Sequence, residues 1–366
     1  MAETTEKRKA DHIRICLEKK AQAKNATAGF EDIQLVHRAL PEVDKQKINL
    51  TTTFLGKKLA APLIVDAMTG GTEEAIKINA SIAEAVENLH LGMGVGSQRA
   101  GIEDKKLEKT YAIARKKAPT AFLIANLGGV QLVHGYGLRQ AKKAIEMIDA
   151  DALAIHLNPL QEMVQHEGQT CFKGVLAKIA EVAGELDKPV IVKETGCGFS
   201  AEDVRLLESS NVKAIDVGGV GGTSFAAVEY YRSNNGKKID EDFWDWGIPT
   251  VISLVETTQT VKLPVVASGG VRNGLQIAKA LALNASLAGI SQPILETAVK
   301  GVKDTQEKIT DLLDELRDVM FLVGADNLDT LTKLPVVIGG KTAQWLTIRG
   351  FDITKYAQRS TLTFEY

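Results

Sequence analysis

Residues 263–274 of the chain read LPVVASGGVRNG, a short apolar run that ends in a polar, glycine-rich loop. Similar apolar runs recur from residue 61 onward, with helical segments between them. Alternating strands and helices are typical of parallel sheets, and eight such units predict a (β/α)₈ TIM barrel. The eight runs are residues 61–68, 91–97, 120–126, 152–158, 189–194, 214–218, 263–268 and 285–291.

An open, doubly wound α/β sheet has the same local pattern, so periodicity alone leaves that fold open. The barrel is favoured because the runs number eight and because polar residues follow nearly every run. Barrel enzymes place their active sites at that end of the strands.

The flanking segments complete the predicted architecture. We expect residues 1–60 to form an N-terminal helix, at 4–23, and a barrel cap. Residues 61–300 are expected to form the barrel, with an insertion at about 230–250 that is a candidate lid or subunit contact. Residues 301–366 are expected to form C-terminal helices, beginning with a packing helix at 304–323, and a tail.

Composition excludes several classes of protein. The 366 residues include 44 basic and 46 acidic side chains, a formal net charge of −2, so the basic excess of a nucleic-acid binder is absent. Hydrophobic residues make up 45% and charged residues 25%, which is ordinary globular usage. No membrane span or signal peptide is evident, and the three cysteines form no CxxC pair. These features predict a cytoplasmic protein.

Two adjacent loops predict a phosphate site. The segment 267–274 (ASGGVRNG) precedes a helix, and GISQP at 289–293 follows the eighth run. Glycine lets a backbone approach a ligand closely, and barrel enzymes bind phosphate after strands seven and eight. The cluster VGGVGGTS at 217–224 fits the far side of the same phosphate, with the Thr223 hydroxyl as a donor. The loop MTGGT at 68–72 could lie against a flat ring.

Lys193 ends the fifth run and has three interpretations. It could form a Schiff base, as in barrel aldolases, or act as a fixed cation beside a cofactor ring. It could also be a structural lysine, paired with Glu194 or a helix end.

The segment HLNPLQE at 156–162 closes the fourth run. Alternation along an extended strand places His156 and Asn158 on one side, facing the barrel mouth, with Gln161 and Glu162 following in the loop. A single carboxylate beside neutral groups suits Mg²⁺ shared with substrate phosphates better than zinc. His156 taken alone is more often structural than catalytic.

Cations that could meet a diphosphate are Arg8, Lys9 and Arg99. For Arg8 and Lys9, a solvated helix face is the simpler interpretation of the residues alone.

The motifs together resemble those of the type 2 isopentenyl-diphosphate isomerases, over roughly residues 8–293. They are RKADH at 8–12, MTGG at 68–71, GSQR at 96–99, HLNPLQE at 156–162, VKETGCG at 192–198, GGTS at 221–224, WGIPT at 246–250 and SGGVRNG at 268–274.

The resemblance implies a (β/α)₈ enzyme with FMN and Mg²⁺ that interconverts isopentenyl and dimethylallyl diphosphate, with NADPH serving only to reduce the flavin. It also implies a homo-oligomer, a tetramer or octamer. Catalytic roles fall on Gln161, His156 and Lys193, and the metal falls on Glu162. Substrate contacts are implied for Arg8, Lys9, Ser97, Gln98, Arg99, His156, Asn158 and Gln161. FMN contacts are implied for Met68, Thr69, Gly70, Ser97, Asn126, Lys193, Thr223, Gly270, Val271, Arg272, Ser291 and Gln292.

The resemblance further implies that reduced FMN acts as the acid and base, with Lys193 beside its ring. The chain departs from the usual family residues at Cys197, at the GGVGG loop 218–222 and at Ser291 and Gln292.

Three rival functions are considered. An FMN-dependent 2-hydroxy-acid oxidase or dehydrogenase shares the barrel, but the histidine followed by Gly-Gly-Arg-Gln that such enzymes use is absent. The others are a flavin-binding regulatory barrel and an aldolase that uses Lys193.

Overall fold

The computed structural model describes residues 5–233 and 241–360. Eight parallel strands close into a barrel in the order β10-β11-β4-β5-β6-β7-β8-β9. This closed ring confirms the (β/α)₈ barrel and excludes the open sheet, which would leave two edge strands. Each predicted run overlaps one strand, and β6 continues two residues past its run: β4 (Leu63–Val65), β5 (Gly92–Gly94), β6 (Phe122–Gly128), β7 (Ala152–Leu157), β8 (Val190–Glu194), β9 (Ala214–Asp216), β10 (Val265–Ala267) and β11 (Leu287–Ile290).

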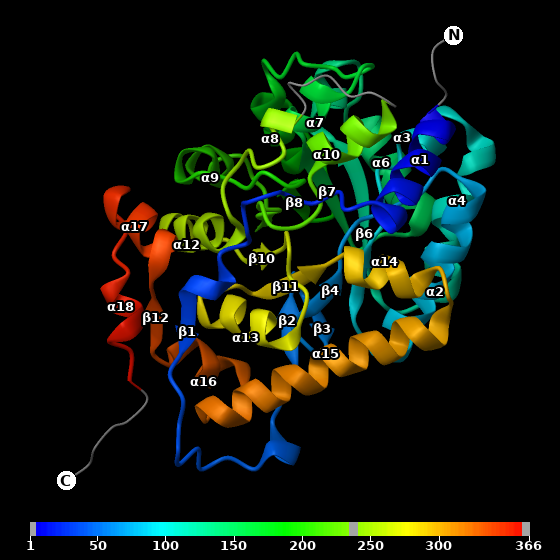
Figure 1. Cartoon of the computed structure of the whole chain (residues 1–366). Coiled ribbons are helices and arrows are strands. Elements are labelled where there is room, and N and C mark those ends of the chain that lie inside the picture. Colours follow the sequence, from blue (N-terminus) through cyan, green and yellow to red (C-terminus); the bar gives the residue numbers. More distant parts are fainter. Residues whose placement is uncertain (1–4, 234–240, 361–366) are drawn as a thin grey trace.

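Helices surround the barrel as an outer layer (Figure 1). They are α2 (Glu73–Asn88), α3 (Arg99–Glu103), α4 (Lys109–Lys117), α5 (Gly129–Val133), α6 (Leu138–Ile148), α7 (Pro159–Val164), α8 (Val175–Glu185), α9 (Ala201–Glu208), α10 (Phe225–Arg232), α12 (Thr250–Thr260), α13 (Gly274–Ala282) and α14 (Gln292–Ala298). Short 3₁₀ turns lie at Phe30–Asp32, Lys45–Lys47 and Lys105–Leu107.

Side chains of alternate strand residues fill the barrel interior. Towards the N-terminal ends of the strands the inward positions are apolar and form one buried cluster, which includes Ile64, Phe122, Ile124, Ala152, Ala154, Ile191, Ala214, Val266 and Leu287. One step further along the same strands the inward positions are polar and also buried: Asp66, Asn126, His156, Lys193, Asp216 and Ser268. Because the side-chain period of a strand is two, one pattern builds both the core and the layer above it.

Two N-terminal elements lie at opposite ends of the barrel. Helix α1 (Thr5–Glu18) lies beside α10 at the end where the strands finish, whereas the hairpin β2 (Thr52–Phe54) and β3 (Lys57–Leu59) lies at the other end (Figure 1). Phe54 and Leu59 join the interior cluster, and the Phe54 ring meets that of Phe122 edge-on at 5.8 Å. The hairpin therefore closes the end of the barrel that carries no polar layer.

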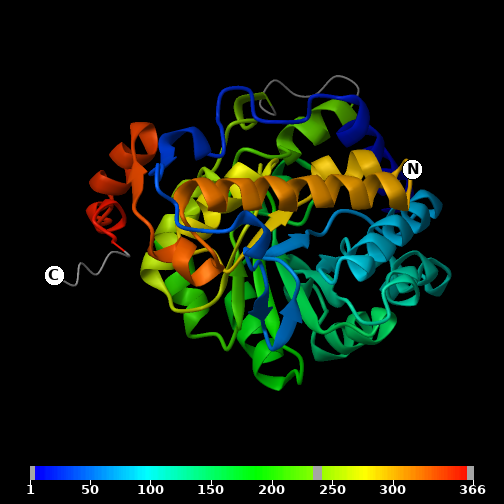
Figure 2. The same cartoon turned by 90° about the horizontal axis from the view of Figure 1, so that it is seen from below.

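The C-terminal segment packs on the outside. Helix α15 (Val302–Val323) runs along α13, α14 and α2, and α16, α17 and α18 follow it (Figure 2). Strand β12 pairs antiparallel with β1. Glu256 of α12 anchors α17 by accepting hydrogen bonds from the side chains of Trp345 and Arg349. Trp345 lies in α17, and Arg349 is the first residue after it. The bounds of these elements are β1 (Ile33–Leu35), α16 (Leu328–Lys333), β12 (Val336–Ile338), α17 (Gly340–Ile348) and α18 (Thr354–Ala357).

The predicted insertion lies partly outside the described residues, which omit 234–240, and the predicted tail ends outside them at 361–366. After the gap, Trp244 is buried against Tyr230 and Tyr231 of α10, whereas Trp246 is exposed. Within the described ranges, none of the helices combines the length and apolar character that crossing a membrane requires.

Phe54→Ala should lower the free energy of unfolding by about 3–5 kcal/mol, because it leaves a cavity at the closed end of the barrel. Urea unfolding followed by circular dichroism measures this change. Leu40→Ala is the control, since Leu40 is 73% exposed and its loss should change stability by less than about 0.5 kcal/mol. Equal effects of the two substitutions would show that the hairpin does not close the core.

Candidate active site

A cavity of about 280 Å³ lies where the barrel strands end, above the polar layer of the interior. Strand order divides its wall into two sides. The loops after β9, β10 and β11 are neighbours on one side, and those after β5, β6 and β7 are neighbours on the other. Strands β4 and β8 separate the two sides and face each other across the barrel.

The β9–β11 side is built from close-packed glycine loops. Gly270 has a φ of +79°, and a β-carbon there would overlap the backbone of Gly221. The backbone N–H groups of Gly270 and Val271 have no acceptor among the described residues, and both residues line the cavity. The N–H of Gly274, at the start of α13, instead donates to Glu315 at 2.8 Å. The loop N–H groups of Gly270 and Val271 are therefore open to a ligand, whereas that of Gly274 is not.

Arg272 adds a cation to this side. Its Nη1 donates to Gln292 Oε1 at 3.0 Å, which links the loops after β10 and β11. No carboxylate among the described residues lies within ion-pair distance of Arg272, so its charge is available to a ligand. Two loop N–H groups and one arginine form the kind of cradle that binds a phosphate.

Lys193 lies on the cavity floor between two buried carboxylates. Its Nζ is 2.9 Å from Asp66 Oδ2 and 3.2 Å from Asp216 Oδ2, and Asp216 also accepts a hydrogen bond from Ser268. Burial opposes the charged lysine, but Asp216 and Asp66 outweigh it and raise the pKa of Lys193 above its ordinary value. Lys193 is therefore a protonated, fixed cation.

Glu194 is not the carboxylate partner that one interpretation of Lys193 required. Lys193 reaches only its backbone carbonyl, at 3.3 Å. The Glu194 carboxylate instead accepts the backbone N–H groups of Gly196, Cys197 and Gly198, and so shapes the loop after β8. Burial raises the pKa of Glu194 to about 7 against the effect of those hydrogen bonds.

His156 points into the cavity with one nitrogen already bonded. Its Nδ1 lies 2.7 Å from Asn126 Oδ1, which can only accept, so Nδ1 carries the proton. Burial, and next the charges of Lys193 and Lys9, lower the pKa of His156 to about 3. At neutral pH the ring is therefore uncharged, and Nε2 is its unprotonated nitrogen.

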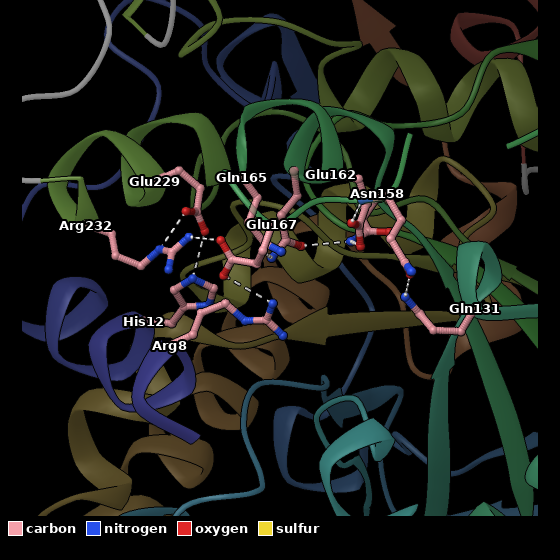
Figure 3. Close-up of polar contacts among 11 residues, drawn as sticks. Arg8, His12, Gln131, Asn158, Glu162, Gln165, Glu167, Glu229 and Arg232 are labelled. Atoms are coloured by element: carbon pink, nitrogen blue, oxygen red, sulfur yellow. Dashed lines mark hydrogen bonds and ion pairs between the residues drawn. The ribbon is translucent and has the colours of Figure 1, made fainter. Parts of the chain in front are cut away.

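Glu162 and Asn158 form a candidate metal site at the start of α7. Glu162 accepts from Asn158 Nδ2 at 3.2 Å and from the backbone of Gln169 at 2.7 Å (Figure 3). Asn158 Nδ2 also donates to Gln161 Oε1 at 3.1 Å, while its own Oδ1 is buried without a partner among the described residues. One carboxylate and one orphaned amide oxygen suit Mg²⁺, which keeps water ligands and shares substrate oxygens. No group of three or more His, Cys, Asp or Glu residues within the described ranges forms a closed metal site.

Helix α1 supplies the cations of the second side. Lys9 Nζ donates to Ser97 O and to Tyr111 Oη, both at 2.7 Å, and Tyr111 Oη in turn donates to Ser97 O. Burial, and then the charges of Arg8 and Arg99, lower the pKa of Lys9 to about 7. An anionic ligand would oppose that lowering and favour the charged lysine.

Ion pairs hold α1 against α10 and the loop after α7. Arg8 pairs with Glu167 at 3.3 Å, and Glu167 pairs with Arg232 of α10 at 2.8 Å (Figure 3). His12 lies 2.8 Å from Glu229, which also accepts from Arg232. Arg99, on the neighbouring α3, pairs with Glu103 at 2.8 Å. All three basic residues predicted to meet a diphosphate therefore line one wall of the cavity.

Comparison with known proteins places the chain in a family. A sequence profile of the FMN-dependent dehydrogenases matches residues 1–125 and 138–337. The isopentenyl-diphosphate delta-isomerase of Methanothermobacter thermautotrophicus is 48% identical over 353 residues, covering 96% of this chain and 99% of that protein. The enzyme of the same name from Pyrococcus furiosus is 48% identical over 370 residues, covering 98% and 93%. The chain belongs to the isopentenyl-diphosphate delta-isomerase family.

Among solved structures, those of mandelate oxidase variants have a fold similar to that of this chain. A variant with 2-hydroxy-phenylacetamide has a TM-score of 0.61 at 16% identity, covering 90% of this chain and 95% of that one. A second variant, with (S)-mandelic acid, has a TM-score of 0.62 at 17% identity, covering 92% and 97%. At such low identity these likenesses show the shared barrel and nothing about the reaction.

Most residues that the isomerase-family resemblance implies line this one cavity. Two do not. Gln98 is buried behind the wall, where its amide bonds to the backbone of Asn126 and Ala144. Gly70 also lies behind the wall, where a β-carbon would overlap the ring of Tyr111. Those in the wall are Arg8, Lys9, Met68, Thr69, Ser97, Arg99, Asn126, His156, Asn158, Gln161, Glu162, Lys193, Thr223, Gly270, Val271, Arg272, Ser291 and Gln292.

Sequence reasoning missed Asp66, Asp216 and Tyr111. The two aspartates follow from the alternation that located His156, because Asp66 is two residues beyond the inward Ile64 and Asp216 is two beyond Ala214. Tyr111 lies within helix α4 and contacts Lys9 across 102 residues of sequence, a contact that no local pattern indicates.

Tyr111→Phe should weaken the binding of inorganic diphosphate about fivefold, because Lys9 loses one hydrogen-bond acceptor while the packed ring is kept. Isothermal titration calorimetry measures the affinity. Tyr356→Phe is the matched control, since the Tyr356 hydroxyl is buried without a partner among the described residues, remote from the cavity. An unchanged affinity in Tyr111→Phe would show that the hydroxyl does not position Lys9.

His156 should remain uncharged in the folded protein as the pH falls from 8 to about 4, because its pKa is lowered to about 3. In the unfolded chain it takes up a proton near its ordinary pKa of about 6.5. Between those values the unfolded state binds more protons, so His156 makes folding less stable as the pH falls. Nitrogen-15 NMR of the imidazoles tests this, and titration of His156 near pH 6.5 in the folded protein would contradict it.

Proposed function

We propose that the chain catalyses the interconversion of isopentenyl diphosphate and dimethylallyl diphosphate, with FMN as its cofactor and Mg²⁺ on the substrate diphosphate. The observation that carries the proposal is a single cavity with two separate anion-binding sides, one made by the β9–β11 loops and the other by α1 and the β5–β7 loops. One side suits a cofactor phosphate and the other a diphosphate. The names of the relatives supply the reaction.

The β9–β11 side fits the phosphate of FMN. Arg272 and the N–H groups of Gly270 and Val271 would bind it, with the Thr223 hydroxyl as a further donor. No arginine is present in the loop 218–222 or at position 292, so Arg272 would be the cation of this side. Reduced FMN, when bound, would supply the acid–base group for the reaction, and we propose NADPH as its reductant.

The opposite side fits an allylic diphosphate. Arg8, Lys9 and Arg99 would neutralise its charge, and Glu162 with Asn158 Oδ1 would hold Mg²⁺ against its oxygens. Neutral His156 would offer Nε2 as an acceptor. The hydrocarbon end of the substrate would then extend toward the cavity floor.

Moving the double bond adds one proton at a terminal carbon and removes another from C2, with no net redox change. This chemistry requires the carbon chain to be held still beside one proton carrier while water is excluded. Gln161, which Asn158 orients at 3.1 Å, would position the reacting carbons. Lys193 would supply a fixed positive charge to the bound cofactor.

Two of the rival functions lose support. An aldolase needs a neutral lysine nucleophile, whereas the pKa of Lys193 is raised by Asp216 and Asp66. A 2-hydroxy-acid oxidase would need the histidine and Gly-Gly-Arg-Gln run that the sequence lacks. The third rival, a regulatory flavin barrel, predicts that Gln161→Ala leaves any measured behaviour unchanged.

The deciding experiment incubates the purified protein with FMN, Mg²⁺ and isopentenyl diphosphate in D₂O under anaerobic conditions, after reduction with NADPH or dithionite. NMR should show dimethylallyl diphosphate that carries deuterium. No conversion by flavin-loaded, reduced protein would overturn the proposal. Oxygen uptake with lactate or glycolate would favour the oxidase. A tetramer or octamer, and the cytoplasmic location, stay predictions, testable by light scattering and by fractionation of cells.

Glu162→Gln should raise the Mg²⁺ concentration needed for half-maximal turnover by tenfold or more, because the site loses its carboxylate charge. Titrating Mg²⁺ in the isomerase assay measures this. Glu84→Gln is the control, since Glu84 pairs with Lys117 on the protein surface. The same Mg²⁺ requirement in both variants would place the metal elsewhere.

A further inference from the structure

The floor of the cavity carries more acid than base. Lys193 comes from β8, Asp66 from the end of β4 on the far side of the barrel, and Asp216 from the neighbouring β9. All three side chains are at least 90% buried. We call these three residues the floor triad.

We propose that Asp66 and Asp216 act as positioning residues that hold Lys193 and offset part of its charge, so that the floor stabilises negative charge on a bound ring less than Lys193 alone would. The proposal rests on the proposed function, because that ring is the FMN of the preceding section. The proposal concerns the ratio of the affinities for reduced, anionic FMN and for oxidised FMN. It predicts that this ratio is lower with the triad than it would be with Lys193 alone.

The second aspartate is what makes this arrangement informative. One carboxylate suffices to pair a lysine, and a neutral buried pair is easier to accommodate than a charged group. The structure adds another carboxylate at 3.2 Å, and burial together with Asp66 raises the pKa of Asp216 to about 6. The triad therefore brings two carboxylates to one ammonium group.

The remaining side chains of this layer add no positive charge that would offset the second carboxylate. The inward residues beside the triad are Asn126, His156 and Ser268, of which the first and last carry no charge. The Nδ1 of His156 is hydrogen-bonded to Asn126 Oδ1 at 2.7 Å. The nearest charge to Lys193 on the floor is thus acidic, and the cations of the cavity lie in its two side walls.

This charge pattern has a chemical use in the proposed reaction. A base that removes a proton from carbon is stronger when its own negative charge is less stabilised. A lysine without carboxylate partners near the ring would stabilise that negative charge and weaken the base. The two aspartates keep Lys193 oriented while limiting this effect.

The test compares the parent protein with Asp66→Asn and Asp216→Asn, each loaded with FMN. The midpoint potential is measured anaerobically against reference dyes at about pH 7.5, where a carboxyl group with a pKa of about 6 is mostly ionised. Each substitution should raise the affinity for reduced relative to oxidised FMN about tenfold. For a two-electron couple this ratio is a positive shift of about 30 mV.

Glu256→Gln is the matched control, because Glu256 is a buried carboxylate that holds Arg349 in the outer helical layer. Its potential should equal that of the parent. A shift in neither aspartate variant, or loss of FMN from both while their circular dichroism matches the parent, would overturn the proposal. A parent that holds FMN but does not isomerise the substrate would overturn the proposed activity alone, since the potentials still decide the role of the triad.

Discussion

The two-residue alternation of side chains along eight closed strands is the constraint on which the rest of the structure depends. Because of it, Ile64 and Asp66 both point into the barrel interior, one layer apart, and so do Ile191 and Lys193. An apolar lower level makes the barrel stable, and a polar level above it gives the cavity its floor. A shift of one residue in any strand would turn its inward apolar and polar side chains to the outer face. The same register therefore specifies both the stability of the barrel and the chemistry of the cavity.

The order of the strands around the barrel determines where each group of the cavity lies. Neighbouring strands supply neighbouring loops, so the groups proposed to bind anions separate into two sides and the charged floor lies between them. A chain with a net charge of −2 can in this way meet two anionic ligands. A few cations and backbone N–H groups, placed by the barrel, replace a general basic excess.

The sequence predicts the fold well because strand ends are local features. All eight runs overlap a barrel strand, and the helix expected at 304–323 is α15 (Val302–Val323). The site is predicted in part. Lys193 and His156 stand out at strand ends, whereas their partners depend on which strands face each other, and no local pattern shows that. The interpretation of Lys193 as paired with Glu194 was wrong for a different, local reason: adjacent residues of a strand point to opposite faces. Gln98 illustrates the reverse case, a polar residue in a family motif whose contacts are with the backbone behind the cavity.

Helix α1 is joined to the barrel chiefly through side chains, although it carries Arg8 and Lys9. Its ion-pair partner in α10, Glu229, is synthesised more than two hundred residues later. A helix made early in synthesis is therefore among the last elements that can dock. The wall proposed to meet the diphosphate is completed only after six of the eight barrel strands exist, which would couple ligand recognition to a nearly finished fold.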